Sequence, residues 1–62
     1  MTKERKELLD DILYLLLKVD EYEIRYRLYV YAEQILFEDI AEQSISLDEI
    51  KKKLKYIKDN YV

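Results

Sequence analysis

Few residues in this chain carry the side chains on which enzymes most often depend. His and Cys are absent from its 62 residues, which excludes imidazole acid–base chemistry, thiolate nucleophiles and the usual zinc ligands. Ser44 and Ser46 fall in an expected connection between helices, where Ser46 is already required as a cap. Glu38 and Glu42 could share a hard cation, but helical di-metal sites add a His that this chain lacks. The sequence therefore predicts a non-enzymatic protein with no catalytic residue, metal site or cofactor.

Tyrosine is the abundant residue that could recognise another molecule, since the chain contains seven tyrosines and one Phe. At helical spacing, three of the tyrosines gather on one side with three further apolar residues, and tyrosine is enriched at protein interfaces. We predict this stripe to be a protein interface. The same tyrosines could instead pack in a core, with their hydroxyl groups at its rim, or stack on bases. The predicted interface residues are Tyr22, Tyr26, Tyr29, Leu36, Phe37 and Ile40.

A lysine-rich run near the C-terminus, "KKKLKYIK", gives an alternative function, the binding of nucleic-acid phosphates. From residue 43 to residue 62, five Lys stand against three acidic residues, which gives a segment charge of +2, and no Arg is present for bidentate reading of bases. The same run is also explained by a solvated helix face, because lysines are favourable in the C-terminal half of a helix, where the helix dipole is negative. The candidate contacts are Lys51, Lys52, Lys55, Tyr56 and Lys58.

The middle of the chain is acidic and suggests another alternative. Residues 20–42 hold seven acidic residues and two Arg, a segment charge of −5. Such a segment could mimic nucleic-acid phosphates and inhibit a regulator that has a basic groove. Exposed acidic residues that only solvate a helix give the same pattern, and Glu38→Lys or Asp39→Lys would separate the two interpretations.

The elements that must position these side chains are predicted to be helices. Gly and Pro are both absent, so the tight hairpins and left-handed caps that depend on Gly are disfavoured. The predicted fold is all-α, a single domain over residues 1–62 with helices at about 3–19, 21–42 and 47–60. Thr2 is the predicted cap of the first helix, Asp20 with Glu23 a capping box for the second, and Ser46 with Glu49 one for the third.

The stretch from Tyr22 to Ala32 also alternates between apolar and polar residues for part of its length, as a half-buried strand does. A strand there would need a partner, and residues 14–19 are the one candidate, joined through Asp20 and Glu21 without the Asn-Gly or Asp-Gly that hairpins prefer. Helix is the favoured interpretation, and the hairpin stays open as the alternative.

Surplus apolar surface predicts self-association. The second helix is apolar on two nearly opposite sides, and the apolar residues of the first helix cover roughly 200° of its circumference, more than one neighbour buries. We expect a homodimer that forms a helical bundle with the second helix central. We also expect a small regulatory or adaptor protein in the cytoplasm, with a protein partner of unspecified identity. No apolar run is long enough to span a bilayer.

Overall fold

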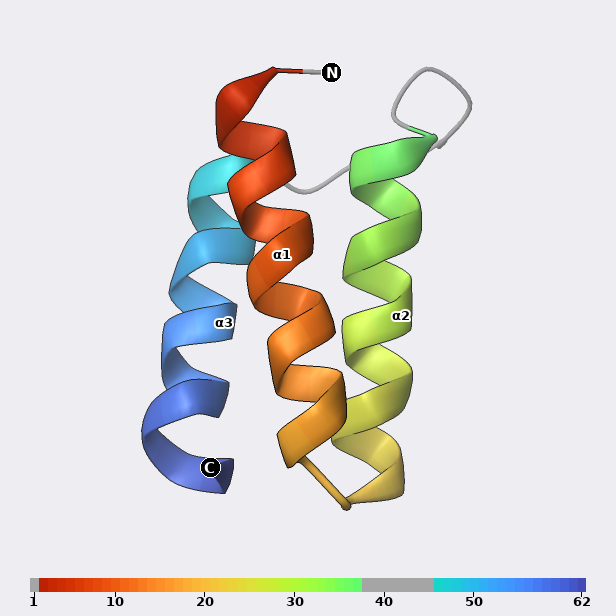
Figure 1. Ribbon diagram of the computed structural model, residues 1–62, viewed down its shortest axis with the longest axis vertical. Coiled ribbons are helices and arrows are strands. Elements are labelled where there is room, and N and C mark those ends of the chain that lie inside the picture. The colour runs from red at the N-terminus through yellow and green to blue at the C-terminus, as the bar shows by residue number, and fades with distance from the viewer. Residues whose placement is uncertain (1, 38–45) are drawn as a thin grey trace.

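Three α-helices form the fold in the computed structural model, which describes residues 2–37 and 46–62. They are α1 (Lys3–Lys18), α2 (Tyr22–Leu36) and α3 (Leu47–Tyr61), and no strand occurs among the described residues. The all-α prediction is confirmed, and so is the helical interpretation of the stretch from Tyr22 to Ala32. In Figure 1, α1 and α3 run in one direction and α2 runs in the other, with all three along the long axis of a body of 30 × 22 × 17 Å.

The start of α1 follows the prediction. The Oγ1 atom of Thr2 accepts a hydrogen bond from the backbone N–H of Arg5 at 3.3 Å, which satisfies one of the amide groups that have no partner inside the helix. At the other end the N–H of Val19 donates to the carbonyl oxygen of Leu15 at 2.8 Å, and Val19 then leaves the helix in an extended conformation. Because Val19 is buried, the chain turns at once and α2 packs antiparallel to α1.

The predicted capping box of the second helix is wrong. Glu21, not Asp20, is the N-cap of α2, and its side chain makes no capping hydrogen bond. Burial of Val19 fixes the position of the short connection, so the first helical bond of α2 runs from the N–H of Arg25 to the carbonyl oxygen of Glu21 at 3.0 Å. Asp20 is left exposed in front of the cap position. Tertiary packing has overridden the local capping signal.

The far end of α2 also differs from the predicted boundary near residue 42. The helix ends at Leu36, and Phe37 is the C-cap, with φ −122° and ψ 37° and its N–H bonded to the carbonyl oxygen of Glu33. Residues 38–45, which include Ile40 and the acidic residues Glu38 and Glu42, lie outside the described residues. After this segment α3 begins as predicted, since the Oγ atom of Ser46 accepts a hydrogen bond from the N–H of Glu49 at 3.2 Å.

The core is made by one apolar stripe from each helix. Its members repeat every three or four residues, as expected for a helix face that is buried against neighbours. Helix α1 packs extensively against both α2 and α3, whereas α2 and α3 have a smaller contact with each other. Among the described residues no polar or charged residue is buried. The core residues are Leu8, Ile12, Leu15, Val19, Leu28, Tyr31, Ile35, Ile50, Leu54 and Ile57.

Candidate protein-interaction surface

The tyrosine-bearing side of α2 lies on the surface of the single chain. Of the predicted interface residues that the structure describes, all are at least half exposed, whereas the opposite stripe of α2 holds the buried residues Leu28, Tyr31 and Ile35. The two-sided pattern of this helix is therefore real, with one side in the core and the other in solvent. The exposed fractions are 80% for Tyr22, 61% for Tyr26, 52% for Tyr29, 52% for Leu36 and 54% for Phe37.

Helix α1 exposes leucines as well. Leu13 is 61% exposed and Leu17, one turn further on, is 85% exposed. Leu9 lies one turn before Leu13 and is partly buried against the core. Exposed leucine is ordinary when isolated, but a row of leucines at four-residue spacing makes a continuous strip along the helix.

Arg25 locates the edge of α2 that lies against α1. Its guanidinium group donates hydrogen bonds to the carbonyl oxygens of Leu16 and Val19, so the stripe of α2 that contains Arg25 must face α1. Tyr29 and Leu36 lie four and eleven residues after Arg25, within about 40° of it around the helix axis. Both therefore lie along the edge where α2 meets α1.

The side of α1 that faces α2 can be found from the side that faces α3. Asp11 lines the groove between α1 and α3, which fixes the α3 side of this helix. At about 100° per residue, and counting through the buried stripe of Leu8 and Leu15, Leu13 lies about 200° from Asp11 and so on the α2 side of the helix. Leu17 lies about 240° from Asp11 and faces outward, nearly opposite the core. Leu13 therefore lies nearest the tyrosines of α2, and Leu17, one turn further on, continues the exposed apolar surface over the outer side of α1. We call this surface the apolar face, and its members are Leu13, Leu17, Tyr22, Tyr26, Tyr29 and Leu36.

A shallow pocket adjoins the apolar face on the outer side of α2. Tyr22 and Tyr26 belong to both, and the remainder of the pocket comes from Glu23, Arg27 and Val30 with the edge of Tyr31. Mixed charge at the margin of an apolar patch is typical of protein interfaces, where a polar rim surrounds an apolar centre.

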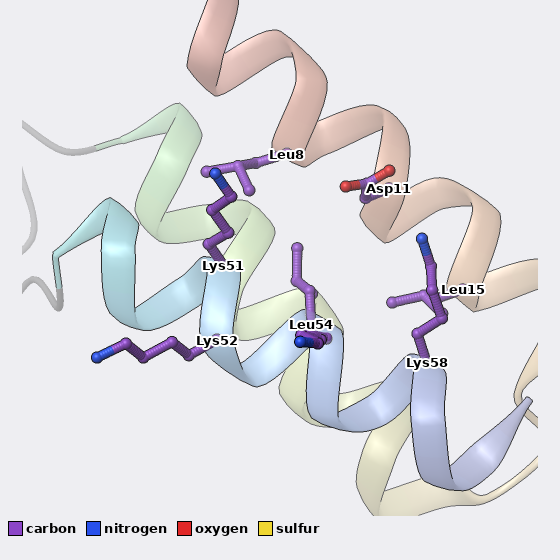
Figure 2. Close-up of a pocket in the computed structure, with 8 residues that line it drawn as sticks. Leu8, Asp11, Leu15, Lys51, Lys52, Leu54 and Lys58 are labelled. Atoms are coloured by element: carbon purple, nitrogen blue, oxygen red, sulfur yellow. The ribbon is translucent and has the colours of Figure 1, made fainter.

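A second surface lies between α1 and α3 and is basic. We call it the lysine groove. It brings together four of the five residues predicted from the lysine-rich run, together with three leucines that form its floor and one carboxylate. In Figure 2, Lys51 extends toward Leu8 and Lys58 toward Asp11, whereas Lys52 points away from α1. The lining residues are Leu8, Asp11, Leu15, Lys51, Lys52, Leu54, Lys55 and Lys58.

Tyr56, the fifth of those predicted residues, does not line this groove. It is 59% exposed, and its ring meets that of Tyr61 edge-on, with centroids 6.4 Å apart and an interplanar angle of 62°. The predicted set of lysines and one stacking tyrosine is therefore divided: the lysines share a groove, and the aromatic ring lies elsewhere on α3.

No group of three or more His, Cys, Asp or Glu side chains that could hold a metal ion occurs within residues 2–37 and 46–62. The Oγ atom of Ser46 is occupied by its cap, while Ser44 and the pair Glu38 and Glu42 fall outside that part of the chain. No helix in the described ranges has the length and apolarity needed to cross a membrane.

Arg25 is the structurally important side chain that the sequence analysis did not single out. The sequence indicates this role only through the position of Arg25, which lies one turn into a helix that follows a three-residue connection. From there its side chain reaches the last carbonyl groups of α1. Lys18, in the last turn of α1, adds a second cation near the same helix end, and its Nζ atom lies 5.8 Å from the centre of the Tyr14 ring.

Comparison with known proteins adds no assignment to these surfaces. No protein-family model, no curated protein and no solved structure gives a significant match to this chain. The function must therefore be inferred from the apolar face and the lysine groove themselves.

Proposed function

We propose that this chain is a small, non-enzymatic protein-interaction module, of a regulatory or adaptor kind, that acts as a homodimer through its apolar face. One observation carries the proposal: six large apolar side chains on the neighbouring helices α1 and α2 are each more than half exposed. Leu17 at 85% and Tyr22 at 80% are almost as accessible as they would be in an unfolded chain.

The size of the apolar face supports an interface. Exposed to the fractions given above, its three tyrosines and three leucines present on the order of 700 Å² of side-chain surface, taking about 200 Å² for a fully exposed tyrosine. Monomeric proteins rarely leave more than a few hundred Å² of contiguous apolar surface uncovered. A standard protein interface buries about 800 Å² on each partner, so the apolar face is close to what one partner contributes.

A second copy of the chain is the partner that the pattern fits best. Leu13 lies near the middle of α1 and Tyr29 near the middle of α2, and both are apolar. A two-fold axis through the centre of the face would therefore set apolar groups against their own copies, without opposing like charges there. Homodimers with this symmetry are also the commonest soluble oligomers.

Tyrosine suits such a face, because it offers a large and rigid contact area while its hydroxyl group can stay at the hydrated rim. The same property explains why three tyrosines can remain on the surface of the single chain. A heterologous protein partner on this face is the competing interpretation, and it predicts a monomeric chain.

A matched pair of tyrosine variants tests the proposal. Tyr26 is 61% exposed on the apolar face and Tyr56 is 59% exposed on α3, away from it. Tyr26→Ala should weaken self-association by roughly tenfold or more, as truncation of an interface tyrosine does, while Tyr56→Ala should leave it within about twofold of the unmodified chain. Sedimentation equilibrium gives the association constant, and circular dichroism confirms that both variants keep their helices. Equal effects of the two substitutions would contradict the proposal.

A further inference from the structure

The lysine groove lies on the side of α1 that is turned away from the apolar face. Its residues on α1 are Leu8, Asp11 and Leu15, whereas the apolar face uses Leu13 and Leu17. Pairing of two chains through the apolar face would therefore leave the lysine groove open, and a partner bound there does not depend on dimerisation.

The lining of this groove is cationic, whereas the chain as a whole is acidic. Four lysines and one aspartate surround it, a local charge of +3 in a chain whose net charge is −3. Leu8, Leu15 and Leu54 lie at the bottom of the groove and are only 4%, 0% and 4% exposed, so most of the accessible apolar surface comes from the lysine side chains above them. Lysine methylene groups extend this apolar lining outward while the ammonium groups stay in water. The groove thus combines an apolar bottom with a cationic rim.

The spacing of the lysines is that of a helix partner. Lys51, Lys55 and Lys58 follow one another at four and three residues, so their ammonium groups repeat along the groove once per turn over about 10 Å. Carboxylates on one side of a partner helix repeat at the same interval, and helices commonly dock into apolar grooves through residues at such positions. We propose that the lysine groove binds an acidic amphipathic helix of a partner protein, with its leucine-like side chains between the methylene groups of the lysines and its carboxylates at their ammonium groups.

A nucleic acid fits the groove less well. Asp11 lies in the groove and would repel a phosphate group, and Figure 2 shows Lys58 extending toward it. The lining contains no Arg for bidentate phosphate or base contacts, and Tyr56, the ring that could stack on a base, lies outside the groove. An apolar floor also gives no advantage to a phosphate backbone, whereas it matches the apolar side of an acidic helix.

The probe for this proposal is a fluorescein-labelled synthetic peptide of about 18 residues, long enough to hold helical structure. It carries Leu along one stripe, Glu on the two flanking stripes and Ala elsewhere. A shuffled peptide of identical composition, with Leu and Glu spread around the helix, is the first control, and a labelled DNA duplex of similar length is the second. Fluorescence anisotropy with the full chain, at low and at physiological salt, measures binding.

Charge reversals on one helix supply matched variants. Lys58 lines the groove, and Lys53 is an exposed lysine of the same helix that does not. We expect the patterned peptide to bind, Lys58→Glu to weaken that binding by about tenfold, and Lys53→Glu to change it by less than about twofold. Asp11→Asn should strengthen peptide binding several-fold, because it removes the one negative charge in the groove.

Four results would overturn the proposal. One is the absence of patterned-peptide binding at low salt up to millimolar concentration. Another is equal weakening by Lys53→Glu and Lys58→Glu, which would mean that only net charge matters. A third is DNA binding that is tighter than binding of the patterned peptide and is weakened by Lys58→Glu, which would make the groove a phosphate site. Equal binding of the shuffled peptide would also contradict it, since the apolar stripe would then contribute nothing.

Discussion

The Nη1 atom of Arg25 donates a hydrogen bond to the carbonyl oxygen of Val19 at 3.0 Å and another to the carbonyl oxygen of Leu16. Carbonyl groups in the last turn of a helix have no partner within that helix, and a cation is favourable there because of the helix dipole. A side chain from α2 therefore completes the end of α1. The same contact fixes the rotation of α2 against α1, and through it the side on which the tyrosines emerge.

Arg25→Ala is predicted to destabilise the fold. Charge-assisted hydrogen bonds at a partly buried helix end are lost and water replaces them only in part, so the free energy of unfolding should fall by about 1–2 kcal/mol. For a domain of this size that loss lowers Tm by roughly 8–15 °C. Thermal melts followed by circular dichroism at a fixed chain concentration give the value. Arg27→Ala, an exposed arginine on the same helix, is the control, and an equal loss of Tm in that variant would disprove the role of Arg25.

Two leucines of α2 should separate folding from association. Leu28 is fully buried and Leu36 is 52% exposed on the apolar face. Leu28→Ala is predicted to cost about 2–5 kcal/mol through lost burial and the cavity left behind, a large share of the stability of so small a domain. Leu36→Ala should keep the circular dichroism spectrum and weaken self-association. Loss of helicity in both variants would place Leu36 among the residues on which the fold depends.

Chemical crosslinking tests the predicted symmetry of the dimer. The chain contains no Cys, so Leu13→Cys introduces a single thiol near the centre of the apolar face. If that position lies close to its own copy across a two-fold axis, a short bis-maleimide should join most chains into covalent dimers, and the yield should resist tenfold dilution. Lys53→Cys, on α3, should give little dimer. Similar yields from the two variants would indicate random collision instead of a defined interface.

Much of this fold follows from local patterns. The predicted helices of residues 3–19 and 47–60 agree closely with α1 and α3, because Thr2 and Ser46 supply caps that act within one turn. The stretch from Tyr22 to Ala32 becomes helical despite its partial alternation, since nothing near it offers a strand partner. The separation of α2 into a Leu28 side and a Tyr29 side follows from the period of 3.6 residues alone.

The remainder depends on contacts distant in sequence. Both sides of α2 are apolar, and periodicity cannot say which one enters the core. Packing decides it: Leu28 and Ile35 fill the space beside α1 and α3, while the hydroxyl groups of Tyr22 and Tyr26 would need partners if they were buried. The cap at Glu21 in place of Asp20 follows from burial of Val19 in the same way. Of the two walls of the lysine groove, only the lysines of α3 could be predicted from the sequence. Asp11, Leu8 and Leu15 of α1 join them only through tertiary packing.

The molar mass of the chain in solution tests the central claim most directly. Size-exclusion chromatography with light scattering, across a concentration series at physiological salt, is the measurement. The apolar face predicts twice the mass of one chain, maintained on dilution until the chain concentration falls to the dissociation constant of the dimer. It also predicts a shift toward the single-chain mass in Tyr26→Ala but not in Tyr56→Ala. A single-chain mass at every concentration, with a cooperative thermal melt, would contradict self-association and leave the apolar face to a different protein.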